Sequence, residues 1–267
     1  MPTQTQAPAS TRQFSEAEMK RYFSTVPSAA IVTVIIGVLL LFIGLSSQAQ
    51  VFLVGGLLLF LIGGGIISAI LIGPKPTDQQ YDTWLNAQAQ RVRVKAVEKL
   101  GLDPRQLTAE PLVIHGFVLS GTKDSISYRA DEIRSKKGTD GKWRFSVNIY
   151  TYFFPEEHHL AAFVGDVNAL NQSSHNEKTE EYFYRDVVGA TTGDEQDTIL
   201  YKKKQYQYRI QRFSLRIASG DSIGVSVNAT PLDNRQNLPN YTIPDSGIDQ
   251  TVANLRALLR SKKQGGV

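Results

Sequence analysis

Two long apolar segments near the start of the chain dominate its hydropathy pattern. Residues 28–45 form a run of 18 residues without a charge, and residues 51–72 form a second run of 22. At about 1.5 Å per residue, helices of these lengths measure roughly 27 and 33 Å, close to the ~30 Å hydrocarbon core of a bilayer. The pattern predicts two transmembrane helices, within a hairpin unit that extends over residues 28–73.

Only five residues separate the two apolar segments. A linker that short requires an antiparallel hairpin, with both outer ends on the same side of the membrane. The linker holds no Lys or Arg, whereas Lys20 and Arg21 precede the hairpin and Lys75 and Arg91 follow it. The positive-inside rule therefore predicts that both termini are cytoplasmic. The alternative for the first segment is a signal peptide cleaved at Ala49; the second segment would still leave the large domain in the cytoplasm.

Small residues recur within both apolar segments at spacings that place them on one helix face. The two rows expected to form the seam of the hairpin are Ala30, Gly37 and Gly44 in the first segment and Gly56 and Gly63 in the second. In lipid, small residues let two helix backbones approach closely. Gly65, Ala69 and Gly73 form a further row, and Gly65 lies about 180° from Gly56 around the helix. This second face predicts a second partner, either another copy of the chain or another membrane protein; the alternative is that glycine is simply common in membrane helices.

The residues before the hairpin predict a disordered tail followed by a short interfacial helix, together spanning residues 1–27. Ser15 and Glu18 fit a capping box. We expect Met19, Tyr22 and Phe23 to face the bilayer, where an amphipathic helix buries its apolar side. The alternative is that this whole region is a disordered tail, as its first eleven residues are expected to be.

A longer amphipathic helix is expected between Thr77 and Gly101, within a linker region of residues 74–108. Its apolar residues recur mostly every three or four positions and form one stripe. They are Tyr81, Trp84, Leu85, Ala89, Val92, Ala96 and Leu100. The stripe favours a helix packed on the following domain, or a stalk paired with neighbours. The alternative is a helix lying on the membrane with Trp84 at the interface.

From about residue 109 to the end, the apolar period changes to two, which is typical of strands. Strands are expected over residues 111–121, 142–154, 158–170, 180–192 and 206–218, with a hairpin back over 220–229. A helix is the alternative for 158–170. Within 206–218 the apolar parity changes after Ile210, which predicts a bulge or bend near Gln211 and Arg212. Residues 248–263 predict an amphipathic helix with apolar residues on one side.

The fold class predicted is a membrane α-hairpin followed by a cytoplasmic α+β domain. In that domain, six or seven antiparallel strands would form a barrel or sandwich closed by the C-terminal helix. This order of elements, the aromatic strand 180–192 and the late hairpin at 219–227 resemble the pleckstrin-homology-like (PH-like) domains of bacterial membrane proteins. The resemblance covers residues 110–263 and implies a binding or scaffolding domain rather than an enzyme.

The composition of the chain limits the classes of partner that it could bind. The 267 residues carry a net charge of +4, of which +3 falls after residue 73. That charge is too small and too dispersed to indicate nucleic acid as a partner. The chain contains no cysteine, which excludes a disulfide framework and any thiolate metal site and suits a domain in the cytoplasm.

One strand combines cations with aromatic residues. Its candidate lipid- or anion-binding residues are Lys202, Lys203, Lys204, Arg209 and Arg212. Basic residues close to an anionic leaflet contribute about 1 kcal/mol each to binding. Single-stranded nucleic acid is an alternative ligand, but a tether to the membrane favours lipid. A solvated strand edge, with lysines that block aggregation, is the other alternative.

Two motifs with possible chemistry are weak. Residues 220–224 match G-x-S-x-G, but that motif requires a following helix, and the residues after it predict a strand. His158 and His159 are adjacent and would point to opposite faces of an extended chain, so they converge poorly on a metal. The other histidines are His115 and His175. No catalytic residue, metal site or cofactor is predicted.

These observations predict a non-enzymatic, membrane-anchored scaffold or interaction module. Its cytoplasmic domain would bind a protein partner or the anionic membrane surface. The alternative is a subunit or regulator of an oligomeric membrane complex or channel, although the apolar segments hold no ionisable residue for an ion path. A lipid-modifying enzyme is a third class, and no catalytic cluster supports it.

Overall fold

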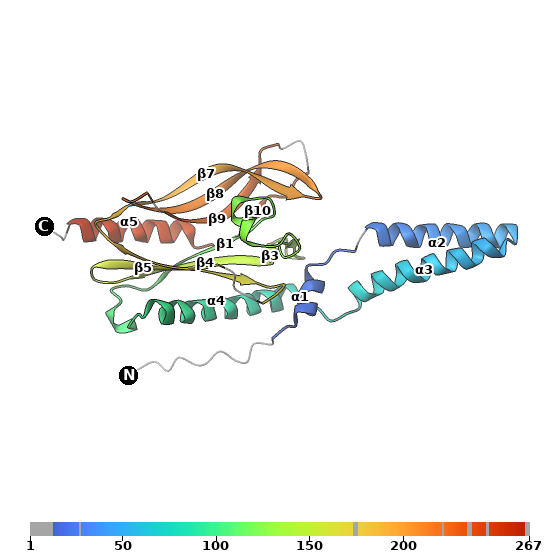
Figure 1. Cartoon of the computed structure of the whole chain (residues 1–267), viewed down its shortest axis with the longest axis horizontal. Helices are drawn as coiled ribbons and strands as arrows, with labels where there is room; N and C mark the ends of the chain where they lie inside the picture. Colours follow the sequence, from blue (N-terminus) through green and yellow to red (C-terminus); the bar gives the residue numbers. More distant parts are fainter. Residues whose placement is uncertain are drawn as a thin grey trace. The chain divides into compact units, whose positions relative to one another are not determined.

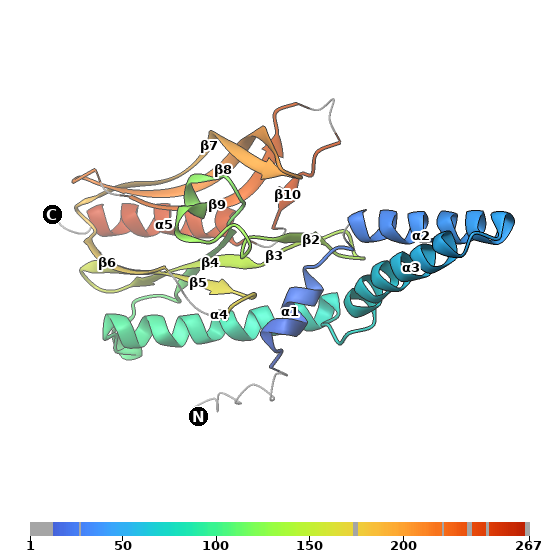
Figure 2. The same cartoon turned by 45° about the vertical axis from the view of Figure 1, so that its right-hand side comes forward.

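The computed structural model describes residues 13–26, 28–172, 176–220, 222–233, 237–243 and 246–264. It contains two compact units: Phe14–Thr77, and a β-rich unit that includes the chain from Asp78 onward. Figures 1 and 2 show the elements of both units from two directions. His175 lies outside the described residues, as do the first twelve residues of the predicted tail.

The first unit holds the two predicted apolar helices, α2 (Ser28–Ser47) and α3 (Gln50–Leu71). Both are long and apolar enough to cross a membrane. They run antiparallel as a hairpin (Figure 1), and most of their large apolar side chains face outward; Phe42 and Leu58, for example, are 67% and 55% exposed. This arrangement places apolar side chains on the outside and leaves the helix contact to small residues, as expected of helices that pack in lipid.

The backbones of α2 and α3 approach closely along the two rows of small residues. A Cβ atom added to Gly37 would lie 2.6 Å from the Phe60 nitrogen and 2.9 Å from the Gly56 oxygen. A Cβ added to Gly56 would lie 2.7 Å from the Leu41 nitrogen, and one added to Gly63 would lie 3.0 Å from the Ala30 oxygen. Backbone atoms cannot yield as a flexible side chain can, so only glycine fits at these positions without separating the helices.

The outer face of α3 is open. A Cβ added to Gly55, Gly64 or Gly65 would meet no atom within 4 Å, and Ala69 is exposed. The predicted continuation of this face to Gly73 is wrong, because α3 ends at Leu71 and Gly73 lies against the Arg21 side chain, which would be 2.8 Å from an added Cβ.

The short helix α1 (Glu16–Tyr22) begins at the predicted capping box. The Ser15 backbone N–H donates to the Glu18 carboxylate at 2.8 Å, and the Glu18 N–H donates to the Ser15 hydroxyl at 3.3 Å. The expectation that Met19, Tyr22 and Phe23 face the bilayer is wrong. Their side chains are at most 4% exposed, because other atoms of the protein already cover them.

The β-rich unit contains two antiparallel sheets of four strands each. The first has the order β1 (Leu112–Phe117), β4 (Val147–Pro155), β5 (His159–Asn168), β6 (Glu177–Phe183). The second has the order β10 (Tyr241–Thr242), β9 (Ser222–Pro231), β8 (Lys204–Ile217), β7 (Val187–Tyr201). A two-stranded ribbon joins β2 (Ser135–Lys137) to β3 (Trp143–Phe145), and two short 3₁₀ helices span Pro104–Gln106 and Lys123–Ser127. Within the described residues the two sheets do not close into a barrel.

Helix α4 (Asp78–Leu100) covers the outer face of the first sheet, as Figures 1 and 2 both show. The Tyr152 hydroxyl of β4 donates to the Ala89 carbonyl of α4 at 2.8 Å, and Trp84 is only 4% exposed. The helix ends at Gly101, whose positive φ of 63° permits a Schellman cap in which Leu102 N–H donates to the Val97 carbonyl. The structure therefore supports the packed alternative for this helix over the membrane-surface one.

Helix α5 (Ile248–Gln264) completes the core by packing against β1 of one sheet and β7 of the other. Its buried residues join side chains from the inner faces of both sheets in one cluster. The cluster includes Ile114, Phe153, Leu160, Phe213, Leu215, Val225, Val252, Leu255 and Leu259. The predicted C-terminal amphipathic helix is confirmed, and its apolar side is the side that closes the core.

Two predicted strands are each divided in the structure. Segment 142–154 is interrupted at Ser146, whose hydroxyl donates to the Glu132 carbonyl and whose N–H donates to the Arg134 carbonyl. Segment 180–192 contains a turn closed by a 2.9 Å bond from the Asp186 N–H to the Phe183 carbonyl. That turn carries the chain from β6 in one sheet to β7 in the other, a change that an uninterrupted apolar pattern conceals. Segment 158–170 is the strand β5, not the alternative helix.

The predicted irregularity in segment 206–218 is confirmed. The β8–β9 register shifts between Gln211 and Arg212, and the unpaired residue is Val227 of β9. On either side of the shift, β8 supplies different clusters: Tyr208 and Ile210 pack with Phe117 and Ile199, whereas Phe213 and Leu215 belong to the main core. The parity change therefore marks the point where the strand passes from one core cluster to another.

A buried arginine joins α4 to the β2–β3 ribbon. The Arg144 side chain, 4% exposed, donates to Asp82 at 2.7 Å and to Asp140 at 2.8 Å. At the same end of α4, the Asp78 carboxylate accepts a hydrogen bond of 2.8 Å from the Thr139 N–H. The hydrogen bond from Arg144 holds the pKa of the Asp140 carboxyl well below its usual range. These ion pairs attach the start of α4 to the sheet unit.

We predict that the close approach of α2 and α3 depends on the glycines in their contact and not on the glycines of the open face. Cysteines replacing Ser28 and Ser68 would carry spin labels, and the absence of other cysteines makes the labelling site-specific. Gly56→Ile should increase the label-to-label distance measured by electron paramagnetic resonance, with overpacking costing about 1–3 kcal/mol. Gly55→Ile, at the neighbouring open position, should leave the distance unchanged. Equal effects of the two substitutions would contradict the seam.

We also predict a pH-dependent loss of stability in Asp140→Asn. Because the folded-state pKa of Asp140 is lowered, its contribution is present above its unfolded pKa and disappears as pH falls through the folded value. Urea unfolding should therefore show the variant less stable than the parent at pH 7, with a difference that shrinks as the pH falls below the unfolded-state pKa of about 3.9. Asp131→Asn, at an exposed carboxyl, serves as the control and should show a smaller difference at pH 7.

Candidate functional site

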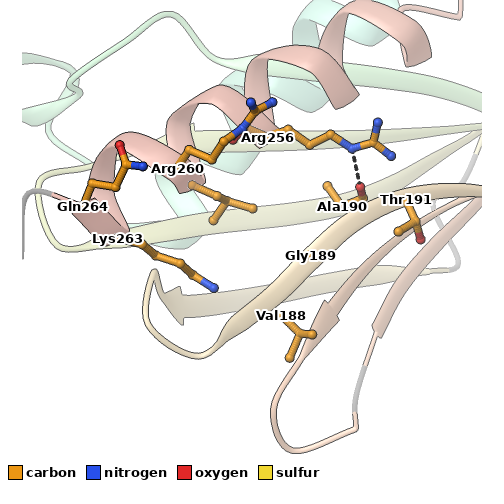
Figure 3. A pocket seen from close by; sticks show the side chains of 9 residues that line it. Val188, Gly189, Ala190, Thr191, Arg256, Arg260, Lys263 and Gln264 are labelled. Atoms are coloured by element: carbon orange, nitrogen blue, oxygen red, sulfur yellow. Dashed lines mark hydrogen bonds between the residues drawn. The ribbon is translucent and has the colours of Figure 1, made fainter.

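A groove lies between α5 and β7 in the β-rich unit. It has a volume of about 390 Å³ and is lined by Val188, Gly189, Ala190, Thr191, Arg256, Leu259, Arg260, Lys263 and Gln264. Figure 3 shows the basic residues on the helix and Val188 on the strand across from them. The volume lies within the range of small-molecule sites, about 300–1,000 Å³.

The helical period places three cations along this groove. Arg256, Arg260 and Lys263 are spaced at i, i+4 and i+7, so they share a face of α5. The apolar stripe that ends at Leu259 lies beside them and is buried in the core. From the sequence, this helix was predicted only as a core element, and the basic row was not predicted. The helical periodicity that located the apolar stripe would also have located this row.

Two of the three cations are held in place by the edge of β7. Arg256 Nε donates to the Ala190 carbonyl at 2.9 Å, and Lys263 Nζ donates to the Val187 carbonyl at 2.6 Å (Figure 3 shows the first). Arg260 Nε donates to the Arg256 carbonyl at 3.3 Å. Each cation therefore has a defined position. The described residues that line the groove include no carboxylate.

A β-bulge forms the strand side of the groove. The β7–β8 register shifts between Val187 and Gly189, which leaves Val188 without a partner on β8. Val188 is 66% exposed, an unusual position for a large apolar side chain next to a core element. Bulges commonly redirect a side chain beside a binding site. The groove thus combines a cationic row with exposed and buried apolar surface.

The basic residues predicted from the sequence do not form one site. Lys202, Lys203 and Lys204 are exposed at the tip of the β7–β8 hairpin, and Arg209 is exposed farther along β8. Arg212 is paired with Asp124 and, at 3.6 Å, with Glu195. Asp124 also accepts the Ser226 hydroxyl at 2.8 Å. These two carboxylates offset the charge of Arg212, which argues against the expected role of this residue in binding an external anion.

The lysine tip has an unusual backbone. Lys202 and Lys203 have φ values of 49° and 64°, which correspond to a two-residue hairpin turn that normally selects Asn and Gly. Positive φ in other L-residues costs roughly 1–2 kcal/mol per residue. Two lysines thus occupy positions where the turn itself does not favour them. Both are exposed, and Lys202 Nζ lies 5.2 Å from the centre of the Tyr201 ring.

The partly buried His115 belongs to a structural network. Asn148 Nδ2 donates to the Phe145 carbonyl at 2.7 Å and to the Tyr81 hydroxyl at 3.2 Å, which leaves its Oδ1 for His115 Nε2 at 2.9 Å. His115 Nε2 must therefore carry the proton. Burial lowers the pKa of His115 to about 4, so the ring is neutral at pH 7 and links β1 to β4 and α4.

The described residues of the two weak motifs do not adopt the arrangements that their chemistry requires. Gly220 has a positive φ of 95° in a turn, and Ser222 begins strand β9 rather than a helix. His158 is exposed, and His159 pairs with Glu156 at 3.4 Å. Among the described residues, no group of three or more His, Cys, Asp or Glu side chains could hold a metal ion.

Comparison with known proteins identified no relative. The chain matches no protein-family model, and searches of curated proteins and of solved structures found no significant match. The resemblance to PH-like domains therefore remains a prediction.

We predict that the lysine tip is strained. Replacing Lys202 by Asn and Lys203 by Gly should raise the free energy of unfolding by about 1 kcal/mol, because Asn-Gly tolerates the positive φ values. Lys204→Gly, at the first residue of β8, should instead lower it by about 0.5–1 kcal/mol through backbone entropy. Urea unfolding would measure both, and destabilisation by the Asn-Gly pair would show that the turn has a different conformation.

Proposed function

We propose that this protein is a membrane-anchored, non-enzymatic binding module. The hairpin of α2 and α3 would span the bilayer, and the β-rich unit would lie on the cytoplasmic side as a scaffold that binds a protein partner or the anionic membrane surface. The observation that carries this proposal is the inverted packing of the hairpin: its apolar side chains face outward, and its interior contact is between backbones at glycine.

This packing supports a lipid environment on energetic grounds. A hairpin in water would expose large side chains along two helices, at about 25 cal/mol per Å² of apolar surface. In hydrocarbon the same exposure costs nothing, and the helices associate through close packing instead. The 46 residues from Ser28 to Gly73 contain no ionisable side chain, so the proposal includes no charge pathway through the membrane.

The membrane anchor would also make a lateral contact within the bilayer. The outer face of α3, with Gly65 open and Ala69 exposed, supports a lateral contact with a second copy of the chain or with another membrane protein. As the alternative, the protein would serve as a subunit or regulator of an oligomeric membrane complex. In either case, the β-rich unit is held within the length of the short connection between Leu71 and Asp78.

The orientation can be tested by the accessibility of single cysteines. Ser47→Cys lies in the exposed end of α2 at the hairpin turn, and Ala130→Cys lies in an exposed loop of the β-rich unit. In sealed cells that express the full chain, a membrane-impermeant maleimide should label the first variant, and the second only after lysis. Labelling of both in intact cells, or of neither, would contradict a cytoplasmic domain behind a spanning hairpin.

A further inference from the structure

We infer that the groove between α5 and β7 binds a single-chain lipid with an anionic headgroup. The headgroup would contact Arg256, Arg260 and Lys263, and the acyl chain would lie along Val188 and Leu259. This inference rests on the proposed membrane location, because that location supplies the ligand.

The charge of the groove indicates an anionic ligand. Arg256 and Lys263 each donate one hydrogen bond to β7, through Nε and through Nζ. In the described residues, no bond involves the two Nη groups of Arg256. No carboxylate is present among the described residues that line the groove, so none of these residues neutralises the three positive charges. Guanidinium groups with free Nη atoms match the geometry of a carboxylate or phosphate.

The apolar part of the groove indicates that the anion carries a hydrocarbon chain. Val188 is 66% exposed at the bulge, and Leu259, a core residue that is 6% exposed, also lines the groove. A free phosphate would use the cations and leave this surface in water. The volume of about 390 Å³ is near the lower end of the range for ligand sites, which favours one acyl chain over two.

The edge of β7 argues against a peptide as the ligand. An extended peptide usually binds beside an edge strand through backbone hydrogen bonds. Here the outward carbonyls of Val187 and Ala190 already accept bonds from Lys263 and Arg256. A peptide strand would have to displace both cations from the backbone, whereas a lipid needs no hydrogen bond from the strand.

The site can be tested by photolabelling in vesicles. The full chain would be reconstituted into phosphatidylcholine vesicles that contain a palmitic acid with a diazirine in its acyl chain. After irradiation, mass spectrometry should find label in peptides that contain Val188 and Leu259. The corresponding diazirine alcohol lacks the carboxylate, so its labelling of these peptides should be lower by about tenfold or more. Equal labelling by the acid and the alcohol would overturn the inference.

Matched variants distinguish a specific effect of the groove cations from a general effect of positive charge on the domain. The triple variant Arg256→Gln, Arg260→Gln, Lys263→Gln should lose groove labelling by about tenfold or more, since each basic residue contributes to anion binding. Lys202→Gln, Lys203→Gln, Lys204→Gln removes the same number of charges from the hairpin tip and should retain the labelling. Loss of labelling only in the lysine-tip variant would overturn the inference in favour of the tip.

A further variant covers the case in which the triple variant fails to fold. Val188→Asp places a carboxylate at a position that is 66% exposed, so it should keep the parent unfolding transition and still lose groove labelling. Labelling of α2 and α3 peptides reports insertion independently. Labelled hairpin peptides with an unlabelled groove would refute the lipid site alone, whereas unlabelled hairpin peptides would refute the membrane proposal itself.

Discussion

The β-rich unit depends on the burial of its first sheet on both faces. Alternate residues of β4 serve two layers: Tyr150, Tyr152 and Phe154 stack in a row on one face, and Phe153 joins the core with α5 on the other. A strand buried on both sides needs a cover for each face. Helix α4 is the cover for the outer face, and the hydroxyl of Tyr152 donates to its Ala89 carbonyl. The segment between hairpin and sheets is therefore a layer of the domain and not a linker.

The fold distributes the cations of the chain into different roles. Arg144 and Arg212 pair with carboxylates inside the β-rich unit and hold elements together. The lysines of the hairpin tip are exposed and unconstrained by ion pairs in the described structure. The cations of α5 are intermediate, since backbone carbonyls position them without neutralising their charge. Only this last group combines a fixed position with available charge, which is the combination that a binding site requires.

The hairpin follows the opposite packing rule from the domain it precedes. In the β-rich unit, aromatic and branched side chains interdigitate at the centre, as in Phe153 against Phe213. In the hairpin, the centre holds Gly37, Gly56 and Gly63, and the large side chains are outside. The difference follows from the solvent each unit suits: water drives apolar side chains inward, whereas lipid leaves van der Waals contact between backbones as the main attraction.

Periodicity alone determined the elements and many of their faces. The uncharged runs identified α2 and α3, and the spacing of the small residues placed Gly37 and Gly56 on the faces where the two helices meet. The parity change located the irregularity at Gln211 and Arg212. Each of these features depends on residues that are close together in the chain. What only the tertiary structure decided depends on residues distant in sequence. The turn at Asp186 separates two sheets, Arg212 meets Asp124, and Met19 is covered. The groove likewise exists only because α5 lies against a bulge in β7, some seventy residues earlier. A local pattern reports which face of an element is apolar, but it cannot report which element lies against that face.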